Sequence, residues 1–399
     1  LFIFLVIFLA VVCMVLAISK FNQHPFIVLT VIAIAVGLVC KIPTEEVINT
    51  VKSGFGNILA SIGIVILAGT IIGTILEKTG AALTMANTIL KLVGKKNSVL
   101  TMAITGYVTG IPVFCDSGFV ILSPISRALA SQSNVSLAVM ATALSGGLYA
   151  THCLVPPTPG PIAMAGTLEA DLGLTILVGL LVSIPATLSA LFYAKKVSGK
   201  IDIPANPEYT VDELLQKYGK LPGALHSFSP ILLPIVLIAL KSVGDFPSAP
   251  FGDGVVKMLF SFIGNPVIAL ILGVFLAMTL VPAAEKKNTL SWITEGVTNS
   301  AGILAITGAG GAFGAILQKL PIADTLSASL LGLGVGVFLP FIIAALLKTA
   351  MGASTVAMIT TSAMIAPLMP ALGFTTPLAK VLVIMAIGAG SMTVSHAND

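Results

Sequence analysis

Long apolar runs recur along the chain and alternate with short polar connections. A helix needs about 20 apolar residues to cross the hydrocarbon core of a bilayer, which is roughly 30 Å thick. The runs that approach this length, and that we expect to form spanning helices, are 1–19, 25–40, 57–76, 173–194, 229–243, 256–281 and 297–317. The pattern predicts an all-α polytopic membrane protein.

Other apolar regions are interrupted by small or polar residues. Residues 98–130 and 333–368 are each too long for one span and have polar centres, which favours two re-entrant hairpins. Residues 135–167 and 378–399 begin as helices and run into Pro-rich or His/Asn/Asp sequence, which predicts two broken helices. The alternative is ordinary spans with kinks.

The distribution of positive charge supports the hairpins. The opposite loops carry little positive excess, so the lysine-rich side should be cytoplasmic. A single span at 98–130 would instead scatter the lysines over both faces. If that region enters and leaves by one face, the basic residues gathered on one side are Lys20, Lys78, Lys91, Lys95, Lys96, Arg127, Lys195, Lys196, Lys200, Lys286 and Lys287.

The chain also repeats itself after about 240 residues. "GTILEKTGAA" at 73–82 matches "GAILQKLPIA" at 314–323. Residues 137–152 match 382–396, which places His152 on His396. Because the first hairpin should open inward and the second outward, the repeats would be inverted, as is typical of secondary transporters.

This pattern predicts a layout of scaffold and repeats. We expect N-terminal scaffold spans in 1–50, a first repeat in 51–194, a cytoplasmic linker in 195–228, connecting scaffold spans in 229–290, and a truncated second repeat in 291–399. Because Leu1 already lies in an apolar run, we also expect an earlier natural start.

Composition narrows the classes of function. Of 399 residues, 56% are hydrophobic and 9% are charged, whereas soluble domains carry about 25% charged residues. The net charge is only +4 and the lysines lie in short loops, so we expect membrane lipid and no nucleic acid as a partner. Cys13, Cys40, Cys115 and Cys153 lie in apolar context without a CxxC pair, so no disulfide, metal or cofactor is expected.

The first hairpin tip, "FCDSG", places a carboxylate in an apolar region. A charge in hydrocarbon is unfavourable by several kcal/mol, so Asp116 should be neutralised or functional. A re-entrant tip exposes N–H groups at a helix N-terminus, which bind anions or orient hydroxyls. We therefore expect Asp116, Ser117 and Gly118 to contact substrate and Asp116 to carry a coupled proton. The alternative is that Asp116 caps the second helix of the hairpin.

The second tip, "KTAMGAST", carries the opposite charge. A buried ammonium at Lys348 suits a small anionic substrate or an ion pair with Asp116. Gly352, Ser354 and Thr355 add N–H and hydroxyl donors for a carboxylate or polyol. If this region is a straight span, Lys348 would instead snorkel to the interface.

Each broken helix is expected to unwind around polar side chains. Prolines in "THCLVPPTPGP" (151–161) leave carbonyls without helical partners, which is viable only beside a polar cavity. We expect His152 and His396 to share proton coupling with Asp116; the alternative is that both histidines are structural. The site residues expected at the two breaks are Thr151, His152, Thr158, Ser395, His396, Asn398 and Asp399.

With these motifs the chain resembles the gluconate permease family, sugar-acid:proton symporters of the ion transporter superfamily. The matching motifs keep the family's order over nearly the whole chain. They are the acid before "GFVIL" at Asp116, "TH…PP.PGP" at 151–161, "GGAF" at 310–313, "GASTVAMIT" at 352–360 and "SH.ND" at 395–399.

The resemblance implies import of gluconate, or a related sugar acid or hydroxy acid, by proton symport across the cytoplasmic (inner) membrane. It also implies an elevator mechanism, a homodimer, and further helices beyond Asp399, because the chain stops inside the last motif. Asp116, Thr158 and Lys348 stand where the family often has Glu, His and Arg, which changes the reach and geometry of the site.

Other functions fit parts of the sequence. A sodium-coupled carboxylate transporter would bind Na⁺ with unwound carbonyls and hydroxyls, whereas the titratable Asp116, His152 and His396 favour protons. A channel would not need tips of opposite charge. An intramembrane hydrolase would pair Ser117 with His152, but the sequence has no G-x-S-x-G or H-E-x-x-H motif, so we expect no enzymatic activity.

Overall fold

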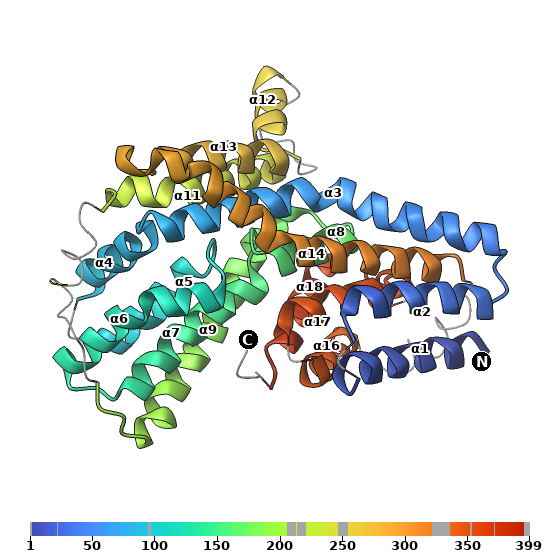
Figure 1. The fold of residues 1–399 in the computed structure, drawn as a ribbon, viewed down its shortest axis with the longest axis horizontal. Helices are drawn as coiled ribbons and strands as arrows, with labels where there is room; N and C mark the ends of the chain where they lie inside the picture. The colour runs from blue at the N-terminus through green and yellow to red at the C-terminus, as the bar shows by residue number, and fades with distance from the viewer. Residues whose placement is uncertain are drawn as a thin grey trace. The chain divides into compact units, whose positions relative to one another are not determined.

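The computed structural model describes residues 2–21, 23–94, 97–205, 213, 221–245, 254–320, 336–351, 353–370 and 372–394 (Figure 1). Within these residues every regular element is a helix. In this described part, five helical segments are long and apolar enough to cross a membrane: Thr44–Lys78, Leu137–Thr167, Leu172–Lys200, Ala224–Gly244 and Ala283–Gln318. The all-α polytopic class predicted from the sequence is confirmed.

The helices follow one another with short connections. The first part of the chain forms α1 (Phe2–Ser19), α2 (Pro25–Val39), α3 (Thr44–Lys78), α4 (Ala81–Val93), α5 (Ser98–Thr109), α6 (Cys115–Ser133), α7 (Leu137–Leu154), α8 (Pro159–Thr167) and α9 (Leu172–Lys196). The second part forms α11 (Ala224–Gly244), α12 (Val255–Ile263), α13 (Pro266–Thr279), α14 (Thr289–Gln318), α16 (Phe338–Met351), α17 (Ser354–Ile365) and α18 (Pro377–Ser391). Short 3-10 turns are η2 (Ser198–Lys200), η3 (Ala283–Asn288) and η4 (Ala366–Leu368).

One predicted span is broken, for a local reason. The run 256–281 forms α12 and α13, which are bent by 64° at their junction. The Asn265 side-chain oxygen caps α13 by accepting from Val267 N at 3.0 Å. Pro266 lacks the N–H that a continuous helix would need. An Asn-Pro pair thus ends one helix and starts the next.

Other helix bounds also differ from the apolar runs. The run 57–76 is part of the 35-residue α3, because the more polar residues 44–56 continue the helix. The linker predicted at 195–228 begins inside α9 and ends inside α11, and residues 206–212 and 214–220 lie outside the described residues. The sequence pattern does not predict α4, whose 13 residues are shorter than a span.

The helices form two units, each with its own internal packing. Unit 1 contains Leu1–Ile66, Pro159–Thr175 and Ser300–Asp399. Unit 2 contains Leu67–Thr158 and Ile176–Asn299. The long helices α3 and α14 each contribute residues to both units.

In unit 2, α5 and α6 pack against α7 (Figure 1). Glycines make the contact between α5 and α7 close. A Cβ added at Gly106 would lie 2.3 Å from the Leu144 carbonyl oxygen, and one at Gly147 would lie 2.2 Å from that of Ala103. These distances exclude larger side chains at both positions, as in small-residue packing of membrane helices.

In unit 1, α16 and α17 pack together and against α18, and α8 packs on α17. The 12-residue α17, like the 12-residue α5 of unit 2, is about 18 Å long at 1.5 Å per residue, which is shorter than a bilayer core. Short paired helices are compatible with re-entrant hairpins. The re-entrant course of both pairs, the side from which each enters the membrane and the inverted repeat all stay predictions.

Candidate functional site

The first hairpin tip lies against α3 and the end of α7. A Cβ added at Gly73 would lie 2.5 Å from the Pro112 carbonyl oxygen, and one at Gly110 would lie 2.5 Å from Thr151 Oγ1. Glycine alone fits at both positions, so the turn is held directly on α3 and beside Thr151. The ring of Phe114 lies 6.2 Å from that of His152, measured between centroids. Unit 2 therefore brings the first tip and the end of α7 together.

Asp116 lies in the first turn of α6, and its side chain is exposed. The N-cap residue is Phe114, and within the described residues no side-chain hydrogen bond caps this helix, so Asp116 does not act as its cap. A carboxylate in the first turn is favoured by the partial positive charge of the helix N-terminus. Ser117 is half-buried and Gly118 is buried, so of these three tip residues Asp116 is the one whose side chain lies at the protein surface.

The structure adds Glu77, which the sequence analysis missed. The Ser117 hydroxyl donates a hydrogen bond to the Glu77 carboxylate, and Glu77 is close enough to Asp116 for their charges to interact. Its neighbour Lys78 forms an ion pair with Glu295, with 2.8 Å between Nζ and Oε1. Glu77 lies one helical turn beyond the glycine that receives the tip, but no local motif joins α3 to α6. Only the tertiary contact identifies it.

The first break, residues 155–158, lies between α7 and α8. Thr158 Oγ1 donates to the Val155 carbonyl oxygen at 2.6 Å, which satisfies an oxygen at the end of the helix. Thr151 Oγ1 lies 3.3 Å and 3.2 Å from the carbonyl oxygens of Gly147 and Leu148. Because these hydroxyl hydrogens are used by the backbone, both threonines would act toward a ligand as acceptors. His152 is buried.

The second tip contains a buried charge. Lys348 lies in the last turn of α16 and is 0% exposed. A snorkelling lysine would expose its ammonium group, so this burial favours a site role over an interfacial one. Ser354 is also fully buried, and Thr355 is half-buried. A Cβ added at Gly160, in the first turn of α8, would lie 4.0 Å from Thr355 Cα, so unit 1 places the start of α17 beside the start of α8.

The remaining expected site residues, Gly352, Ser395, His396, Asn398 and Asp399, lie outside the described residues. Their roles stay predictions. Asp116 and Lys348 belong to different units, so the ion pair expected between them also stays a prediction.

The chain is similar to permeases along its whole length. A family model described as GntP family permease matches residues 2–399. An uncharacterized permease of Haemophilus influenzae is 38% identical over 90% of this chain and 77% of its own. The gluconate permease of Pseudomonas aeruginosa is 31% identical over 98% of this chain and 87% of its own. The D-serine transporter DsdX of Escherichia coli K12 is 32% identical over 98% of this chain and 88% of its own.

Two solved structures share the fold at low sequence identity. Neisseria gonorrhoeae MtrF, described as illuminating a class of antimetabolite efflux pumps, aligns with a TM-score of 0.64 and 15% identity, over 94% of this chain and 86% of its own. The Alcanivorax borkumensis YdaH transporter aligns with a TM-score of 0.59 and 16% identity, over 93% and 88% of the two chains. At these identities the likeness extends to the fold and not to the substrate.

Proposed function

The chain belongs to the GntP permease family, and from that premise we propose that it imports gluconate, or a related sugar acid or hydroxy acid, by proton symport across the cytoplasmic (inner) membrane. A permease moves its solute without converting it. The chain is therefore a multi-pass membrane transport protein and not an enzyme, which excludes the hydrolase alternative.

The burial of Lys348 is the observation that carries the substrate assignment. An ammonium away from water binds a carboxylate strongly, because little solvent competes with the ion pair. A carboxylate is common to gluconate, L-idonate and D-serine, the solutes named for the relatives. Ser354 and Thr355 supply hydroxyls for the substrate's own hydroxyl groups.

Counterflow in proteoliposomes tests this assignment. Vesicles preloaded with gluconate should take up labelled gluconate, and external sugar acids should compete better than neutral polyols of equal length. Equal competition by a polyol and its acid would contradict the carboxylate site.

We assign proton coupling to Asp116, with His152 and His396 as further candidates. The exposure of Asp116 at the first tip supports this role, because a coupling carboxylate must exchange protons with water. Glu77 adds a second carboxylate beside Asp116 at the same tip.

An elevator mechanism and a homodimer complete the proposal. The family resemblance implies both, and the apolar surface of α9 suits contact with lipid or with a second copy. Leu181, Leu188 and Phe192 on that helix are 67%, 54% and 65% exposed. Cross-linking of the protein in lipid should trap a dimer; a monomer alone would contradict this part of the proposal.

The hairpin topology predicts the side from which the α5–α6 pair is labelled. Asn97 is the N-cap residue of α5, Gln132 lies in the last turn of α6, and both are exposed. In a cysteine-free background, Asn97→Cys and Gln132→Cys should both react with an impermeant thiol reagent from the cytoplasmic side. Reaction from opposite sides would exclude the re-entrant hairpin and, with it, the inverted repeat.

Glu77→Gln should change the pH dependence of uptake. The amide keeps a hydrogen-bonding oxygen for Ser117 but removes a charge beside Asp116. The fold should accept the change, because the aligned position in the second repeat, Gln318, is already glutamine. Glu46→Gln is the matched control: it removes the partner of Lys319, an exposed ion pair in unit 1, and should leave the pH profile unchanged. A wild-type profile in Glu77→Gln would show that Glu77 has no part in coupling.

A further inference from the structure

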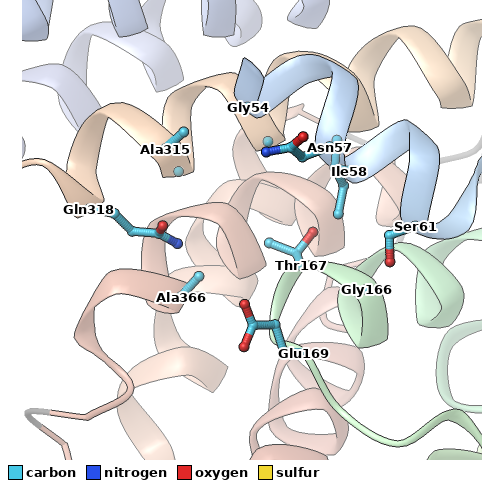
Figure 2. Close-up of a pocket in the computed structure, with 12 residues that line it drawn as sticks. Gly54, Asn57, Ile58, Ser61, Gly166, Thr167, Glu169, Ala315, Gln318 and Ala366 are labelled. Atoms are coloured by element: carbon cyan, nitrogen blue, oxygen red, sulfur yellow. The ribbon is translucent and has the colours of Figure 1, made fainter. Parts of the chain in front are cut away.

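Unit 1 contains a polar cavity that the proposed transport mechanism does not use. Its volume is about 250 Å³, and its walls are α3, the end of α8, the end of α14 and Ala366 (Figure 2). A second space of about 450 Å³ adjoins it, shares Thr167, Glu169 and Gln318 with it, and extends to Lys380. The volume of the second space falls within the range of roughly 300–1,000 Å³ that is usual for small-molecule pockets.

Polar side chains from separate helices converge on this cavity. Asn57 and Ser61 lie one turn apart on α3, Gln318 ends α14, and Thr167 ends α8. Figure 2 shows the amides of Asn57 and Gln318, the Thr167 hydroxyl and the Glu169 carboxylate directed toward a common space. Within the part of the chain that the structure describes, no side-chain hydrogen bond to the protein is made by Asn57, Ser61, Thr167 or Gln318. Their polar atoms are therefore available to water or a ligand.

The position of Asn57 along α3 indicates what its side chain faces. Asn57 begins the apolar run 57–76 that is expected to cross the membrane, about 20 Å along α3 from Thr44 at 1.5 Å per residue. A polar side chain within such a run normally faces a water-filled cavity or a protein partner, and not lipid. Asn57, Ser61 and Gln318 are all exposed. The polar lining of the cavity is therefore accessible from the surface of unit 1.

A cation and an anion stand together at one end of the cavity. Lys380 Nζ donates to the Glu169 carbonyl oxygen at 3.2 Å and lies 3.9 Å from Glu169 Oε2. Glu169 has a φ of 51°, in the left-handed region that helix ends normally reserve for glycine or asparagine. This conformation closes the end of α8 as a helix cap, with Ala170 N donating to the Ala165 carbonyl oxygen at 2.8 Å, and it turns Glu169 toward Lys380.

We propose that this cavity is a second binding site for an anionic polyol, separate from the residues at the hairpin tips. Lys380 binds the carboxylate, while Asn57, Thr167, Gln318 and the Glu169 carboxylate bind the hydroxyls. The Glu169 carboxylate can accept hydrogen bonds from several ligand hydroxyls, and the nearby Lys380 ammonium offsets the negative charge of Glu169. The helix α8 separates the two places, since its first turn lies beside Thr355 and its last residue lines the cavity. Only the choice of a sugar acid as ligand rests on the proposed function.

Thiol labelling with gluconate as the probe tests the site. In a cysteine-free background that also carries Lys348→Ala, Asn57→Cys should react with a charged thiol reagent, and gluconate should slow the reaction at least several-fold. Sorbitol, the neutral polyol of equal length, should protect less. Adding Lys380→Gln should raise the gluconate concentration needed for protection about tenfold, the effect of losing one charge-assisted contact. Gln23→Cys, in an exposed loop of the same unit, should label at a rate independent of gluconate.

The outcomes separate this inference from the proposed function. If Asn57→Cys misfolds, Gln318→Cys serves as the reporter from the opposite wall. A reporter that does not react at all, or that gluconate does not protect, overturns the second site. Protection that disappears in the Lys348→Ala background also overturns it, because the effect would then come from the transport site. Protection without gluconate uptake by the wild type would support the cavity site and contradict the proposed function.

Discussion

Lys348→Ala is expected to reduce uptake of a carboxylate substrate by about one to two orders of magnitude. The side chain is fully buried one turn from the second tip, so its contact with a carboxylate would be shielded from water. A hydrogen bond to a charged group contributes about 1.5–3 kcal/mol. Uptake below saturation should therefore fall by roughly 10- to 100-fold, at about 1.4 kcal/mol per factor of ten. Initial rates of labelled gluconate uptake in proteoliposomes measure the loss.

Two further variants show whether charge is the cause. Lys348→Arg keeps the charge and should retain part of the activity, although its planar group changes the geometry of the contact. Lys241→Ala removes a lysine whose partner is Asp245, at the end of α11, and should transport normally. Normal uptake by a folded Lys348→Ala would make Lys348 a structural charge and would remove the main support for the anion site.

Asp116→Asn is expected to abolish proton-driven accumulation while sparing exchange. Asparagine keeps the shape and hydrogen bonding of the side chain but cannot take up a proton. The exposed position of Asp116 at the start of α6 means that the substitution leaves no buried group without a partner, so folding should be unaffected. Counterflow of gluconate should continue at a substantial fraction of the wild-type rate, whereas uphill accumulation should be lost.

The pH profile of the same variant decides between the titratable candidates. Asp245→Asn, which changes an exposed carboxylate far along the chain, should leave accumulation unchanged and serves as the control. If Asp116→Asn still concentrates gluconate with a wild-type pH dependence, Asp116 does not carry the proton. His152, beside Phe114 at the tip, would then be the next residue to replace.

The sequence predicts the class of fold because that class depends on local properties. Apolar runs of crossing length identify most of the long helices, and prolines at 156–161 locate the interruption between α7 and α8. Hydropathy does not show where a helix continues into more polar sequence, so it misses the first residues of α3. It also averages over Asn265 and Pro266, which end one helix and begin another.

Some residues of the candidate site can be predicted from local sequence and others cannot. Asp116 and Lys348 can be predicted, because a charge in an apolar run is unfavourable unless it is paired or functional. Glu77 cannot be identified as a site residue from the sequence, because it stands beside Lys78 at the end of a helix. Its place at the first tip depends on its contact with Ser117, which lies on another helix. The cavity residues Asn57 and Gln318 are ordinary polar residues in sequence, and only the fold places them around one space.

The most direct test of the central claim is uphill gluconate transport driven by protons alone. Purified protein in sodium-free proteoliposomes should accumulate labelled gluconate above its equilibrium level when the outside is made acidic. A protonophore should abolish that accumulation. Accumulation that requires a sodium gradient, or gluconate entry that never exceeds equilibrium under a proton gradient, would contradict proton symport.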